Sequence, residues 1–241
     1  MINRGKKPVI KITRAVAKRV LEVVDAGLTS GVGVAEPGKM CVEAAVCYAM
    51  GLPHGDNPDC VSRALRSLKI RLNDSNWSSD QARDKGLRRL AIAQLGSAGF
   101  LDESEFIKRV LGVVIRKTFP KAFRAVAAVI KDESRKAKWA DLATRCEAAP
   151  EQITAREARQ FFIELKQNAY AYAYAADAAD AYAAAAYAAD AAAYAAAYAD
   201  APKKRAVARD KSLAAFCEEV VQVLIGMKVP GCKWLDLAEA A

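Results

Sequence analysis

Cys41, His54 and Asp56 are the residue types of a thiol-based catalytic triad, and they lie close together in the sequence. The helix expected over residues 39–50 places Cys41 in its first turn, where a helix N-terminus lowers the pKa of a thiol and favours nucleophilic attack. His54 and Asp56 follow the far end of that helix, roughly 15–18 Å away, so pairing requires the intervening loop to fold back. A cysteine in an apolar helix is more commonly a small core residue. A thiol-dependent enzyme using Cys41 and His54 is therefore the alternative interpretation.

The spacing of cysteines around the single histidine does not fit a metal site. Cys41, Cys47, His54 and Cys60 follow the pattern C-x5-C-x6-H-x5-C, without the CxxC pair of a zinc knuckle. Cys41 and Cys47 would also point in different directions from one helix. We expect no metal and no cofactor. The chain has six scattered cysteines and begins without the apolar core of a signal peptide, which predicts reduced thiols in a cytoplasm.

The loop before this helix resembles a phosphate-binding loop. Gly33, Gly38 and Lys39 match the pattern G-x-x-x-x-G-K, but Met40 stands where the magnesium-binding hydroxyl belongs. The preceding segment is also a helix and a Gly-rich loop rather than a strand, so the sequence does not favour a nucleotide-hydrolysing loop. A weaker function remains, in which Lys39 and the free N–H groups of a helix start hold an anion.

Glu43 is a carboxylate in an otherwise apolar helix, CVEAAVCYAM. Such a group must be paired, protonated or part of a site. One interpretation places Glu43 at the rim of the core, stabilised by the helix dipole. The other places it inside, against an arginine or a ligand.

A second candidate site lies in the polar stretch from Leu72 to Ser97. Arg83 shares a helical stripe with Leu87 and Leu90, beside a loop that contains Trp77. An arginine in this position can hold a phosphate through bidentate hydrogen bonds, or can simply pair with Asp74 or Asp80. We therefore count Lys39, Glu43, Trp77, Arg83, Arg88 and Arg89 as candidate ligand-binding residues.

The formal charge of the chain is +9 and its pI is about 9.3, which favours an anionic partner such as a nucleotide or nucleic acid. Solubility is the simpler explanation of the same charge. No segment is apolar enough to predict a membrane span, so we expect no membrane partner.

Helical periodicity predicts an all-α protein, a multi-helix bundle with one long Ala-rich helix. Thr13, Asn57, Ser78 and Asp102 are expected to cap helices, and Thr118 with Pro120 to open another. Residues 169–201 contain only Ala, Tyr and Asp, which predicts about 30 residues of uninterrupted helix. Tyr187, Tyr194 and Tyr198 share a face of that helix, which would pack in this chain or against a second copy as a homo-oligomer. We expect a boundary between a multi-helix basic domain, 1–149, and residues 150–241, which contain the long Ala-rich helix and a C-terminal amphipathic helix.

Residues 39–97, residues 218–237 and the Ala/Tyr/Asp run together resemble an uncharacterised family of bacterial and phage proteins without an assigned activity. The resemblance implies no reaction and no site. It favours a bacterial or phage cytoplasm. We therefore expect a helical protein that binds an anionic ligand, with a small nucleotide favoured over nucleic acid. Sequestering a nucleotide signal would fit a phage host. A ligand-free structural or assembly protein is the remaining alternative.

Overall fold

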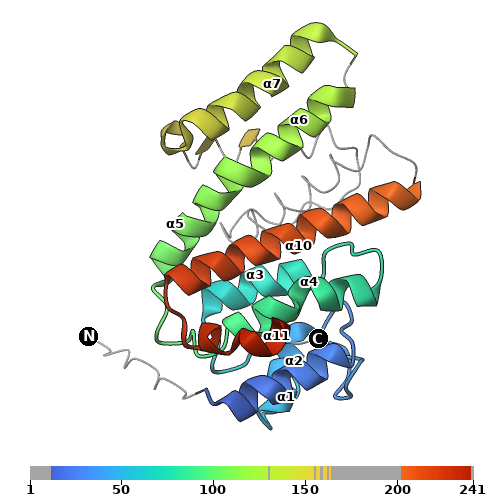
Figure 1. Ribbon diagram of the computed structural model, residues 1–241, viewed down its shortest axis with the longest axis vertical. Coiled ribbons are helices and arrows are strands. Elements are labelled where there is room, and N and C mark those ends of the chain that lie inside the picture. Colours follow the sequence, from blue (N-terminus) through green and yellow to red (C-terminus); the bar gives the residue numbers. More distant parts are fainter. Residues whose placement is uncertain are drawn as a thin grey trace. The chain divides into compact units, whose positions relative to one another are not determined.

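A computed structural model describes residues 12–129, 131–154, 156–157, 160–161, 163 and 202–239. These residues form two compact units, which are described separately below (Figure 1). The first unit contains residues 12–75, 79–106 and 217–239, and the second contains residues 76–78 and the described part of 107–216. The described residues contain helices and a single isolated β-bridge but no strand, which confirms the all-α prediction.

Four helices build the body of the first unit: α1 (Arg14–Asp25), α2 (Val42–Ala49), α3 (Arg63–Asn73) and α4 (Asp80–Ala93). Thr13 caps α1 as expected, because its hydroxyl accepts a hydrogen bond from the N–H of Val16. The apolar face of α1 packs against α2 and α4. α2 is buried on nearly every side, which follows from its lack of a polar face. The core of this unit therefore surrounds α2.

The connection from α1 to α2 doubles back in a tight hairpin. Gly33 forms an isolated antiparallel bridge with Met40, and the N–H of Val34 donates to the carbonyl of Lys39 at 2.8 Å. Gly33 has a positive φ of 69°, and a Cβ there would lie 2.0 Å from the Lys39 carbonyl oxygen. Only glycine fits this close approach.

The C-terminal segment completes the first unit. From Cys217 onward, α10 (Pro202–Gly226) belongs to this unit and is followed by η3 (Pro230–Trp234) and α11 (Asp236–Glu239). The N–H of Gly231 donates to the carbonyl of Leu95 at 2.8 Å, and a Cβ on Gly231 would lie 2.2 Å from the Ile92 carbonyl. Glycine therefore lets η3 dock directly on the end of α4.

A rod of helix and a partner helix form the second unit. From Ile107 onward, α5 (Glu103–Val113) belongs to this unit and continues through the π-helical turn η1 (Val114–Thr118) into α6 (Phe119–Val129). α7 (Glu133–Ala148) packs beside α6 (Figure 1). The short η2 (Pro150–Gln152) follows. Phe119, Phe123, Trp139 and Phe161 form an aromatic cluster with ring centroids 5.3–6.1 Å apart. Stacked and edge-to-face ring pairs of this kind stabilise the unit beyond their buried area.

Three expectations about helix ends are wrong. The cap of α3 is Ser62 rather than Asn57, and the cap of α4 is Ser79 rather than Ser78. Thr118 and Pro120 open no separate helix, because a π-helical turn carries the chain through and the N–H of Phe119 donates to Val114. The boundary expected between residues 149 and 150 falls within the second unit. The Ala/Tyr/Asp run, 169–201, lies outside the described residues.

Candidate functional site

The loop that resembles a phosphate-binding loop bonds to itself. The N–H groups of Val34, Glu36 and Lys39 donate to carbonyls within the same hairpin. The exposed ammonium of Lys39 pairs with the carboxylate of Glu36 at 2.7 Å. These contacts occupy three backbone N–H groups and the ammonium of Lys39, which are groups that a bound phosphate would otherwise use.

Cys41 caps α2 instead of opening its first turn. Its buried sulfur accepts a hydrogen bond from the N–H of Ala44 at 3.4 Å, and burial raises the pKa of its thiol. His54 is exposed, with Nε2 3.1 Å from the carbonyl oxygen of Gly33. Asp56 pairs with Arg66 at 2.9 Å. Cys41, His54 and Asp56 thus contact other groups rather than one another. The raised pKa of the Cys41 thiol also disfavours the thiolate that a nucleophile needs.

Glu43 is fully buried in the first unit and lies opposite a fully buried lysine of α3. The distance from Lys69 Nζ to Glu43 Oε1 is 3.6 Å, which is longer than a hydrogen bond. Among the described residues, neither carboxylate oxygen of Glu43 has a hydrogen-bond partner, and neither does Lys69 Nζ. Burial raises the pKa of Glu43 and lowers the pKa of Lys69, because each charged form loses its hydration.

Sequence reasoning did not identify Lys69 as a site residue. Its spacing does carry a signal, because Lys69 lies four residues after Leu65 and three before Leu72, two buried positions of α3. Residues at these spacings share a helix face. Lys69 on the apolar stripe of α3 and Glu43 in the apolar helix α2 therefore form one buried pair.

Arg83 is buried, and its guanidinium joins three segments of the first unit. Its Nε donates to the carbonyl of Asn73 at 2.8 Å, and its Nη1 contacts the carbonyl of Leu28 and the carboxylate of Asp80. The pairing with Asp80 is one of the simple alternatives that the sequence left open. Arg83 therefore acts as a structural bridge between the end of α3 and the chain after α1.

Arg88 and Arg89 also hold the first unit together. Arg88 forms a bidentate pair with Asp25 of α1, at 2.7 and 3.0 Å. Arg89 pairs with Glu218 of α10 at 2.9 Å and with Glu239 of α11 at 2.5 Å. Trp77 is buried and belongs to the second unit. The three arginines thus reach three different sets of partners rather than one ligand position.

The two units differ in charge. The segments of the first unit, 12–75, 79–106 and 217–239, contain 14 Lys and Arg against 16 Asp and Glu. In the second unit, residues 107–157 contain 12 Lys and Arg against 6 acidic residues, and residues 202–216 contain 5 against 1. The positive charge of the described chain therefore belongs to the second unit.

Exposed basic side chains extend along both packed helices of the second unit. Lys117, Lys121 and Arg124 follow at helical spacing, so they share a face of the η1–α6 rod. Arg124 pairs with Glu147 across to α7, with Nη2 2.6 Å from Oε2. The exposed basic residues of α7 are Arg135, Lys136, Lys138 and Arg145.

Within the part of the chain that the structure describes, no helix is long and apolar enough to cross a membrane. In that same part, no three His, Cys, Asp or Glu side chains come together as a metal site. Comparisons with protein-family models, with curated proteins and with solved structures find no match. The function must therefore be argued from the residues themselves.

Proposed function

We propose that this protein binds an anionic partner and that the second unit provides the binding surface. The observation that supports this is the division of charge, with an excess of six basic residues in 107–157 and no basic excess in the segments 12–75, 79–106 and 217–239 of the first unit. An excess concentrated on one unit attracts phosphate groups more strongly than the same charge spread evenly over a protein.

The distribution of these residues favours nucleic acid over a small nucleotide. The basic side chains follow two packed helices, α6 and α7, whose apolar faces are used against each other in the aromatic cluster. An extended row of exposed charges fits the repeated phosphates of a polymer, whereas a single nucleotide needs a closed pocket. The partner class we test first is therefore single- or double-stranded nucleic acid.

A salt titration of binding tests this proposal. Fluorescently labelled oligonucleotides are titrated with the protein at several salt concentrations, and binding is measured by fluorescence anisotropy. If phosphates are neutralised, the logarithm of the association constant falls linearly with the logarithm of salt concentration, with a slope of about −0.7 to −0.9 per phosphate contact.

A labelled nucleotide, measured in parallel, separates the two classes of anion. Binding of oligonucleotides with a clear salt dependence, together with weak binding of the nucleotide, supports the nucleic-acid surface. Tight nucleotide binding without oligonucleotide binding would replace that surface with a small-ligand site. Absence of binding to either at low salt would contradict the proposal.

A further inference from the structure

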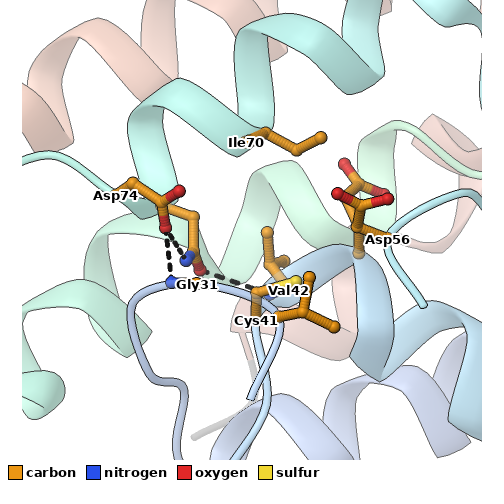
Figure 2. A pocket seen from close by; sticks show the side chains of 9 residues that line it. Gly31, Cys41, Val42, Asp56, Ile70 and Asp74 are labelled. Carbon is orange, nitrogen blue, oxygen red and sulfur yellow. Dashed lines mark hydrogen bonds between the residues drawn. The ribbon is translucent and has the colours of Figure 1, made fainter. Parts of the chain in front are cut away.

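A small cavity lies beside the buried pair in the first unit, and three of its nine lining residues are acidic. Its volume is about 70 Å³, and its lining includes the side chains of Glu43, Asp56 and Asp74. Figure 2 shows Asp74 and Asp56 on opposite sides of the cavity, with Cys41 and Val42 between them. Some residues of the lining, such as Asp74, are exposed to solvent, whereas Glu43 is fully buried.

Three hydrogen-bond donor groups of the cavity wall, on Gly31, Val42 and Asn73, are already used. The N–H of Gly31 donates to Asp74 at 2.8 Å, and the N–H of Val42 donates to the side-chain oxygen of Asn73 at 3.2 Å (Figure 2). The amide nitrogen of Asn73 donates to Asp74 and to the carbonyl of Thr29, each at 2.9 Å. These three donor groups are therefore not free to hold an anion, and they leave the carboxylate oxygens as the acceptors to be considered.

The acceptors are not all used. Both oxygens of Glu43 are buried without a hydrogen bond among the described residues, and its nearest cation, Lys69, stays 3.6 Å away. A buried carboxylate without hydrogen bonds is energetically costly. When such a carboxylate lines a cavity, we infer that a ligand with hydrogen-bond donors binds in the cavity. Counting Arg66 with Asp56, three carboxylates face two cations, so one negative charge is formally uncompensated.

We propose that this cavity binds the protonated amino group of a small ligand, with Glu43 as its buried acceptor. A primary ammonium carries one positive charge and three donors, which matches the uncompensated charge and the unmet oxygens. The size also fits, because a cavity of about 150 Å³ holds a benzene ring and this cavity is about half as large. The site lies in the first unit, so it is independent of the anion-binding surface of the second.

The test uses methylammonium chloride as the probe, with sodium chloride and tetramethylammonium chloride at the same ionic strength. Calorimetric titration and thermal unfolding are measured on the full chain. We expect saturable binding and a saturable rise in Tm with methylammonium alone, because tetramethylammonium has no donor and sodium needs a set of oxygens closer together. The double variant Glu43→Met/Lys69→Met removes the acceptor without leaving a buried charge unpaired.

The variant Glu22→Gln is the control, because Glu22 is an exposed carboxylate of the same unit. We expect it to keep the methylammonium response, and the double variant to lose it. If the three salts act equally on the native protein, the cavity holds only water and the proposal is wrong. A methylammonium response that survives in the folded double variant would also overturn it, since the binding would then lie elsewhere.

Discussion

Basic residues have different surroundings in the two units. In the first unit, Arg83, Arg88 and Arg89 each contact carboxylates or carbonyls of other segments in that unit, and Lys69 is buried against Glu43. In the second unit, the basic residues of α6 and α7 are exposed and outnumber the acidic residues about them. The first unit thus uses charge to hold its fold, whereas the second presents charge to solvent.

The comparison teaches that net charge alone does not locate a binding surface. The densest arginine cluster in the sequence, Arg83 to Arg89, belongs to the unit with a small acidic excess. A bidentate arginine serves a carboxylate of its own chain as well as it serves a phosphate. Burial and partners decide which of the two it does.

The largest effect expected is on the buried pair of the first unit. Lys69→Met leaves the carboxylate of Glu43 buried without its cation, which should lower the free energy of unfolding by about 3–5 kcal/mol. The double variant Glu43→Met/Lys69→Met removes both charged groups and should recover most of that loss. Urea unfolding followed by circular dichroism measures both.

The matched control for this pair is Lys18→Met, which breaks an exposed ion pair of α1 at 3.8 Å. Its effect should stay below about 1 kcal/mol. If Lys69→Met were no more destabilising than Lys18→Met, the pair would be exposed to water in solution. The contrast between buried and surface charge would then fail.

A smaller loss of stability is expected from replacing an arginine, and it should differ between the two units. Arg83→Met removes a buried hydrogen bond to the Asn73 carbonyl and should cost about 1–3 kcal/mol. Arg124→Met removes an exposed pair with Glu147 and should cost much less, because water screens the two charges. Urea midpoints of the two variants give the comparison, and equal costs would show that the two arginines hold their units alike.

Much of the helical fold could be predicted from the spacing of apolar residues. Thr13 and Asp102 were identified as caps, because Thr and Asp are preferred just before a helix. There the side-chain oxygen accepts a hydrogen bond from a free N–H of the first turn. The π-helical turn before Phe119 could not be found, since nothing in the local pattern marks a register shift. Likewise, the choice of Ser62 over Asn57 as the α3 cap depends on how the preceding loop packs.

The site was only partly predictable. Glu43 was recognised as a residue that needs a partner, because charge in an apolar helix is conspicuous. Its partner Lys69 was overlooked, since lysines on helices are commonly exposed and the pairing joins two separate helices. At the hairpin of Gly33 a local motif suggested an anion site, whereas the N–H groups of Val34, Glu36 and Lys39 donate to carbonyls within the hairpin.

The most direct test of the two-unit account is a pair of triple charge reversals measured for oligonucleotide binding. One variant carries Lys121→Glu, Lys131→Glu and Lys136→Glu in the second unit. Its matched control carries Lys18→Glu, Arg63→Glu and Lys85→Glu at exposed positions of the first unit. Both change the net charge of the chain equally.

We expect the second-unit variant to lose about tenfold or more in affinity at low salt and to show a shallower salt dependence. The first-unit variant should lose much less and keep the slope of the native protein. If the two variants lost affinity equally, binding would follow net charge alone. A larger loss in the first-unit variant would place the anion-binding surface there and contradict the account.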